Sequence, residues 1–143
     1  MLKENKKFIL ISFCALIFFI LDRALKFFAL RNKILFIKNY NLALSINLNI
    51  PDFIILFLYL IIFIILIFCL IKSIKNKNII LAAGFLFLII GIASNFLDRL
   101  KFGFVIDYIN FYFFYNNLAD IYIFFGIVLF LLKYRKQDDN KVI

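Results

Sequence analysis

Long apolar runs divide this chain into four segments that predict membrane-spanning helices. Phe53 to Ile71 is nineteen apolar residues without interruption, and Ile79 to Leu97 is a second run that polar residues enter only near its end. A helix needs ~20 such residues to cross a bilayer. Two weaker runs lie near the two ends of the chain. We therefore predict one membrane domain of residues 1–143, with helices at about 8–28, 53–71, 79–98 and 117–133.

The segment between the first two runs has an alternating pattern of polar and apolar residues. From Asn39 to Ile50, polar and apolar residues alternate along the chain, and a period of two predicts a strand. Residues 102–113 are a second candidate, with Gly103 providing a turn. We expect a β segment at about 34–50 and a loop at 99–116. The pattern leaves open whether this strand only rests on the helices or lipid, or cradles an extended substrate.

Composition and charge place these elements in a membrane. The chain is 66% hydrophobic and carries a net charge of +9, which is far from the composition of a soluble domain. Ten of its seventeen Lys and Arg residues precede the first run, fill the loop at 72–77 or follow the last run. The positive-inside rule then predicts that both termini are cytoplasmic. Because the charge is explained by topology, we expect no nucleic-acid partner.

Four aspartates converge on the outer face in this topology, namely Asp22, Asp98, Asp107 and Asp120. The chain has no histidine, and both of its cysteines lie inside apolar runs, which excludes Ser-His and Cys-His nucleophilic systems. Carboxylates remain for hydrolytic chemistry. Two close aspartates that share one proton separate in pKa, so that one activates a water while the other donates a proton. Such a pair needs no metal or cofactor.

Two polar pairs and one stripe of small residues follow helical spacing. Asn95 with Asp98, and Asn117 with Asp120, are three residues apart and share a helix face. Gly84 and Gly91 lie on the stripe that continues to Asn95. Because glycine lets two helix backbones approach closely, we expect tight packing along that stripe.

Four motifs occur in a fixed order along the chain: Asp22-Arg-Ala-Leu-Lys26, Asn39-Tyr-Asn-Leu-Ala-Leu-Ser45, Asn95-Phe-Leu-Asp98-Arg99 with Gly103-Phe-Val-Ile-Asp107, and Asn117-Leu-Ala-Asp120. Together they resemble the motifs of the lipoprotein signal peptidases (signal peptidase II). The second motif departs from the family pattern, because Asn41, Leu42 and Leu44 stand where the family has Gly, Ala and Phe.

The resemblance implies an all-α membrane protein, with four transmembrane helices and a small β-sheet (a cradle) on the outer face. It implies an intramembrane aspartyl endopeptidase of the bacterial cytoplasmic (inner) membrane. This enzyme would cleave diacylglyceryl-modified prolipoproteins just before the lipidated cysteine, with Asp107 and Asp120 as the catalytic pair. We expect a monomer whose partners are membrane lipids and the lipidated substrate. The implied supporting residues are Asp22, Lys26, Asn39, Ser45, Asn95, Asp98, Arg99 and Asn117.

Other interpretations of the same residues stay open. Asp98 and Arg99 form only a structural ion pair in one of them, and Asp22 and Lys26 only a local helix pair. The chain is also compatible with a small proton- or ion-coupled carrier or with a non-catalytic assembly factor. Carriers usually hold their charges near the bilayer midplane on broken helices within inverted repeats, whereas these aspartates cluster at one edge.

Overall fold

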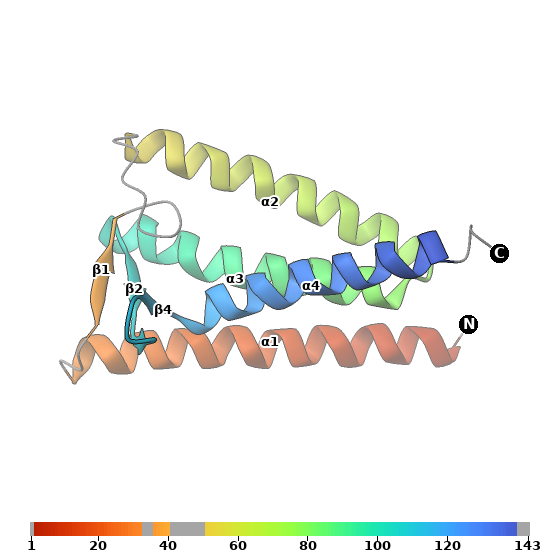
Figure 1. Cartoon of the computed structure of the whole chain (residues 1–143), viewed down its shortest axis with the longest axis horizontal. Helices are drawn as coiled ribbons and strands as arrows, with labels where there is room; N and C mark the ends of the chain where they lie inside the picture. The colour runs from red at the N-terminus through yellow and green to blue at the C-terminus, as the bar shows by residue number, and fades with distance from the viewer. Residues whose placement is uncertain (1, 33–35, 41–50, 140–143) are drawn as a thin grey trace.

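The computed structural model describes residues 2–32, 36–40 and 51–139, and these residues form four helices and four short strands. The helices run roughly alongside one another, and the strands lie at one end of the bundle (Figure 1). The start of the first helix and the end of the last both lie at the opposite end of the bundle. The elements are α1 (Leu2–Arg31), β1 (Ile37–Asn39), α2 (Asp52–Lys75), α3 (Ile79–Phe102), β2 (Val105–Asp107), β3 (Ile109–Asn110), β4 (Tyr115–Asn116) and α4 (Leu118–Asp139).

Three of the described helices are long and apolar enough to cross a membrane: α1 from Asn5 to Arg31, α2 from Phe53 to Lys75, and α3 over its whole length. The fourth predicted span corresponds to α4. Its apolar stretch is short, because Asp120 lies in its first turn and charged residues begin at Lys133. The protein is therefore a largely helical membrane protein with small antiparallel sheets at one end.

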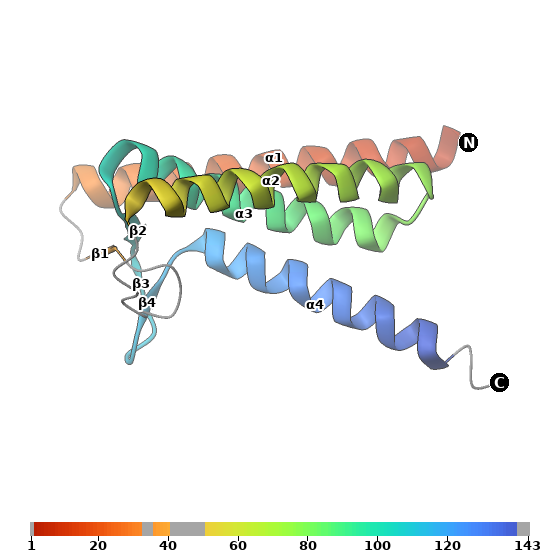
Figure 2. The same ribbon diagram turned by 90° about the horizontal axis from the view of Figure 1, so that it is seen from above.

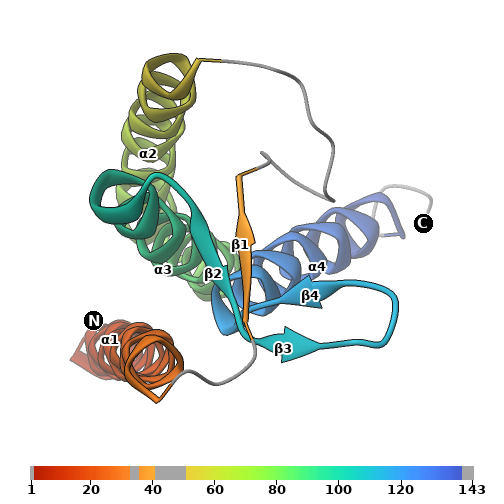
Figure 3. The ribbon, with the colours of Figure 1, turned by 90° about the vertical axis from the view of Figure 1, so that its left-hand side faces the viewer.

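The strands make two separate antiparallel pairs. β1 pairs with β2, so that Ile37 lies opposite Asp107 and Asn39 opposite Val105. β3 pairs with β4 to form a hairpin. In Figure 3 the β1–β2 pair crosses the middle of the bundle end, and the hairpin projects to the side where α4 begins. Of the strand predicted at 34–50, the residues Ile37–Asn39 form β1. Residues 34–35 and 41–50 lie outside the described part of the chain.

The predicted loop at 99–116 is shorter than expected and more structured. α3 continues to Phe102 and ends where Gly103 adopts a left-handed conformation (φ 76°), which is readily accessible to glycine. β2, β3 and β4 occupy most of the remainder. The sequence indicated a strand within residues 102–113 but did not indicate β4.

The contact between α3 and α4 depends on small residues, as the glycine stripe predicted. A Cβ atom added at Gly91 would clash with the backbone carbonyl oxygen of Ala119 and lie 2.7 Å from Ile123 Cγ1, so only glycine fits there without movement of α4. A Cβ atom added at Gly126 of α4 would likewise meet the side chain of Leu88 on α3. This close approach brings the polar end of α3 beside the first turn of α4, where Asp120 lies.

Candidate active site

Asp107 ends β2 and is almost fully buried, with 2% of its surface exposed. Both of its carboxylate oxygens accept hydrogen bonds from asparagine side chains. Asn39 Nδ2 donates to Oδ2 over 2.9 Å, and Asn117 Nδ2 donates to Oδ1 over 2.6 Å. Burial raises the pKa of Asp107 from 3.8 to about 6. The two amide donors oppose this change, and the negative charge of Asp120 adds to it.

Asp120 lies in the first turn of α4 and belongs to the same hydrogen-bonded group. Asn95 Nδ2, from α3, donates to its Oδ1 over 2.8 Å. Its backbone N–H donates to Asn117 Oδ1 over 3.0 Å, so that Asn117 caps the helix. The Asn117 side chain therefore binds Asp107 through its nitrogen and the Asp120 backbone through its oxygen. One side chain fixes the relative position of the two acidic residues.

Two cavities open at the strand end and share Asn39 as a wall. One has a volume of about 260 Å³ and is lined by Asp107 and by the hairpin residues 112–115. The other, of about 510 Å³, is lined by Asp120, Asn95 and Arg99 and extends to the apolar residues Ile123, Phe124 and Ile127 of α4. The two aspartates thus border neighbouring spaces, one mainly beside the hairpin and one reaching along α4.

A group of buried charges joins α1 to α3. Lys26 Nζ lies 2.8 Å from Asp98 Oδ2 and 3.4 Å from Asp22 Oδ2, and all three side chains are fully buried. Arg23 Nη1 lies 2.5 Å from Asp98 Oδ1 and also donates to the Ser94 backbone oxygen over 3.1 Å. Two cations therefore balance two anions in this group.

The buried group also connects to the catalytic candidates. Lys26 Nζ donates to Asn95 Oδ1 over 2.8 Å, and the amide nitrogen of Asn95 donates to Asp120. The local Asp22–Lys26 pair expected from the sequence is present. Asp98 has Arg23 and Lys26 as ion-pair partners, whereas the sequence suggested Arg99.

Asp22 joins three elements at this end of the bundle. Its Oδ2 accepts a hydrogen bond from Ser94 of α3 over 2.5 Å. Its Oδ1 accepts from the Tyr108 hydroxyl over 2.9 Å and from the Ala119 backbone N–H over 3.3 Å. The Tyr108 hydroxyl in turn accepts from Leu118 N over 3.3 Å. Asp22 thus anchors the start of α4 to α1, and burial raises the pKa of Tyr108 above its ordinary value.

Sequence reasoning missed three of these residues: Arg23, Ser94 and Tyr108. Arg23 occurs in the Asp22-Arg-Ala-Leu-Lys26 motif, but the sequence assigns it no role. Ser94 lies four residues before Asp98, and this spacing was the one signal that pointed to it. Nothing in the local sequence marks Tyr108.

The remaining predicted site residues lie at the edge of this network or outside the described chain. Arg99 donates from Nη1 to the Tyr40 carbonyl oxygen over 3.4 Å, and its guanidinium lies 5.9 Å from the centre of the Tyr59 ring. Ser45, Asn41, Leu42 and Leu44 lie outside the described residues. Within the part of the chain that is described, the acidic and cysteine residues form no group arranged to hold a metal ion.

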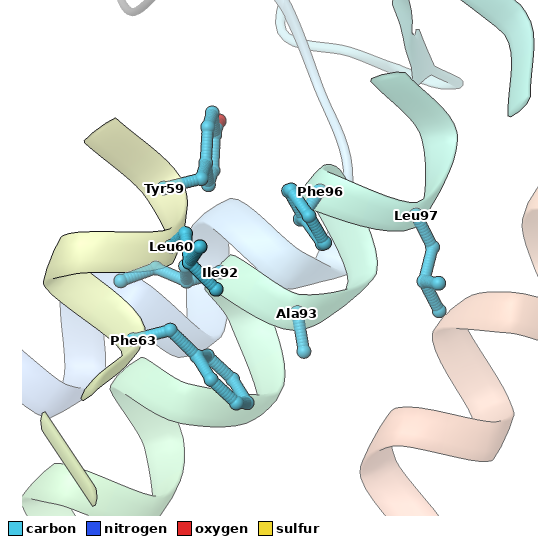
Figure 4. A pocket seen from close by; sticks show the side chains of 7 residues that line it. All are labelled: Tyr59, Leu60, Phe63, Ile92, Ala93, Phe96 and Leu97. Carbon is cyan, nitrogen blue, oxygen red and sulfur yellow. The ribbon is translucent and has the colours of Figure 1, made fainter. Parts of the chain in front are cut away.

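A separate apolar cavity of about 290 Å³ lies between α2 and α3 (Figure 4). Tyr59 and Phe63 of α2 face Ile92 and Phe96 of α3 across it. Tyr59 also lines the larger cavity at Asp120. The polar site is therefore bordered, on the side of α2, by an apolar surface that can contact hydrocarbon chains.

Comparisons with known proteins bear on the family and the fold of the chain. A family model described as signal peptidase (SPase) II matches residues 14–135 of the chain. Two solved structures, both described as bacterial membrane enzymes, share the fold. One is 24% identical with a TM-score of 0.75, and the match covers 94% of this chain and 90% of that chain. The other is 23% identical with a TM-score of 0.68, covering 89% of this chain and 91% of that chain. No curated protein sequence matches the chain.

Proposed function

Because this chain belongs to the signal peptidase II family, which is a family of aspartic peptidases, we propose that it removes signal peptides from diacylglyceryl-modified prolipoproteins. The bond cleaved is the peptide bond just before the lipidated cysteine. Membership in the family makes the protein a hydrolase with lipoprotein signal peptidase activity. The substrate chemistry, the cleavage position and the roles of individual residues form the proposal.

Asp107 and Asp120 are the proposed catalytic pair. One observation carries this assignment: the two carboxylates come from different elements, yet Asn117 binds both residues and each carboxylate accepts a hydrogen bond from a further asparagine. The raised pKa of Asp107, at about 6, suits a carboxyl group that exchanges a proton near neutral pH.

In the proposed reaction the ionised aspartate takes a proton from a water, and the oxygen of that water attacks the scissile carbonyl carbon. The protonated aspartate donates its proton to the carbonyl oxygen, which gives a tetrahedral diol. As the C–N bond breaks, the aspartate that took the water proton donates it to the leaving amine, and the other aspartate takes a hydroxyl proton from the diol. Asn39, Asn95 and Asn117 hold the carboxylates in place for this reaction, because each donates to one of them. Such positioning lowers the barrier by removing the need to reorganise the site in each cycle.

The proposed substrate path follows the cavities. The larger cavity reaches from Asp120 along α4 to Phe124 and Ile127, which suits a signal helix and acyl chains that arrive within the bilayer. We propose that the strand end faces outward from the bacterial inner membrane, with both termini in the cytoplasm. The enzyme acts as a monomer whose partners are membrane lipids and the lipidated precursor.

The test is to substitute each aspartate singly and to measure cleavage of a lipidated precursor in vesicles. Asp107→Asn and Asp120→Asn keep side-chain size but remove the titratable carboxyl group. We expect each to lower the cleavage rate by 10²-fold or more. The matched control is Asp139→Asn, at the far end of α4, for which cleavage should equal that of the unchanged protein.

Thermal unfolding in detergent separates loss of chemistry from loss of structure. A variant that unfolds like the unchanged protein but does not cleave supports the catalytic role. Full cleavage by either folded variant would contradict the aspartate pair as the mechanism.

A further inference from the structure

The hairpin formed by β3 and β4 ends in four consecutive aromatic residues, Phe111 to Phe114, which we call the aromatic tip. Tyr112 and Phe113 are each 89% exposed, and Phe111 and Phe114 are about half exposed. The surrounding segment carries no charge, since no charged residue lies between Asp107 and Asp120. So much uncharged aromatic surface in one turn needs a partner other than water.

The backbone of the aromatic tip is fixed by its own hydrogen bonds. Phe111 N donates to the Phe114 carbonyl oxygen over 2.9 Å, and Tyr112 N donates to Asn110 Oδ1 over 2.7 Å. Tyr112 has a positive φ of 69°, which is unusual for a residue other than glycine. The Phe111 and Phe114 rings stack with their centres 5.5 Å apart. These bonds hold the most exposed rings outward rather than folding them against the protein.

The position of the aromatic tip identifies what covers it. The hairpin lies at the strand end of the bundle and projects beyond the helices on the side of α4 (Figure 2, Figure 3). α4 begins directly after β4 and carries further exposed rings at Phe124 and Phe125. The hairpin therefore lies level with the ends of the apolar spans and beside the surface that faces lipid.

We propose that the aromatic tip inserts into the interfacial layer of the bilayer at the strand end of the protein. Tyrosine and phenylalanine rings fit this layer, because it accepts apolar rings and leaves polar edges hydrated. Asn110 of β3 and Asn116 of β4 flank the aromatic tip in the sequence. The occupant is the lipid interface itself and not the peptide substrate.

The proposed anchor has a consequence for the site. Tyr112 and Phe113 also line the cavity at Asp107, across from Asn39. A membrane-inserted tip would hold this cavity at the boundary between lipid and water, where a lipid-modified peptide is expected to lie. The anchor itself does not depend on the peptidase activity, because it rests on exposure, rigidity and position.

The chain offers a direct test, because it contains no tryptophan. Phe113→Trp places the single tryptophan of the chain at the aromatic tip, where it can be excited selectively over the seven tyrosines. The protein is reconstituted into vesicles of phosphatidylethanolamine and phosphatidylglycerol that contain lipids brominated either near the carbonyl end or near the tail end of the acyl chain. Phe57→Trp on α2, where the native ring is 60% exposed within an apolar span, is the membrane-buried control. N-acetyltryptophanamide in buffer is the water reference.

We expect Phe113→Trp to emit at a shorter wavelength than the water reference. It should be quenched more strongly by lipid brominated near the carbonyl end than by lipid brominated near the tail end. Emission at the wavelength of the water reference, without quenching by either lipid, would overturn the proposal. Quenching or a blue shift that appears only after a lipidated peptide is added would overturn it too, in favour of a substrate contact. If Phe113→Trp does not fold, Tyr112→Trp provides the same measurement. Emission and quenching are measured without cleavage, so the test does not depend on peptidase activity.

Discussion

Lys26 is a cation with no exposed surface, and its replacement should destabilise the protein strongly. Its Nζ contacts Asp98 over 2.8 Å, Asp22 over 3.4 Å and Asn95 Oδ1 over 2.8 Å. Methionine is close to lysine in length and keeps the apolar packing while removing the charge. Lys26→Met therefore isolates the electrostatic contribution of the ammonium group.

The expected magnitude follows from the charge balance of the buried group. Asp22 and Asp98 are balanced by Arg23 and Lys26, so Lys26→Met leaves one uncompensated negative charge in a site without water contact. Removing one partner of a buried ion pair costs about 3–5 kcal/mol. That is a large part of a total stability of roughly 5–15 kcal/mol. The partly exposed Arg23 limits the loss, because it still neutralises Asp98.

The assay is the free energy of unfolding, measured by titration with sodium dodecyl sulfate in mixed micelles. Lys72→Met, at an exposed position on α2, is the matched control and should change stability by less than ~0.5 kcal/mol. The double variant Lys26→Met with Asp98→Asn restores neutrality. Its loss should be smaller than the sum of the single losses by about 0.5–3 kcal/mol. A loss for Lys26→Met no larger than that of the control, or strict additivity in the double variant, would refute the charge argument.

Three further predictions concern other parts of the network. Asp107 holds its proton more tightly when folded (pKa about 6) than its ordinary value of 3.8. Its contribution to the free energy of unfolding should therefore fall by roughly 3 kcal/mol as the pH rises from about 4 to about 6. Unfolding measured across this range should lose that dependence in Asp107→Asn. Tyr108→Phe removes the hydroxyl that bonds Asp22 and Leu118, and should lower stability by about 1–3 kcal/mol in chemical unfolding, whereas an unchanged midpoint would argue against this link. Gly91→Ala should destabilise by about 1–3 kcal/mol, because its Cβ meets the Ala119 backbone oxygen and Ile123. Gly84→Ala, with looser surroundings, should cost less in the same assay, and an equal loss would contradict close packing as the cause.

The sequence pattern was enough to identify the apolar helices. An uninterrupted apolar run such as Phe53 to Ile71 has few alternatives to a membrane span. The prediction that Asn117 and Asp120 share a helical turn is confirmed, with Asn117 as the cap that precedes α4. These features depend on neighbours within a few residues, which is the range that a sequence pattern describes.

The buried ion pairs could not be obtained in this way. Arg23 and Asp98 are far apart in the chain, and their contact depends on how α1 is rotated against α3. The sequence favoured Arg99 as the partner of Asp98 because it is adjacent, but adjacent residues on a helix do not face each other. Tyr108 was missed for a similar reason, since its hydroxyl bonds Asp22 on a distant helix.

The orientation of one amide links this distant network to the proposed chemistry. An asparagine side chain has a single acceptor atom and a single donor atom at its end. Lys26, which can only donate, occupies the acceptor of Asn95, so the donor of Asn95 is left for Asp120. Without the cation, a flipped amide would present its oxygen to the Asp120 carboxylate and repel it. Lys26 on α1, which touches neither proposed catalytic residue, thus fixes the Asn95 amide in the same orientation that the Asp120 carboxylate favours.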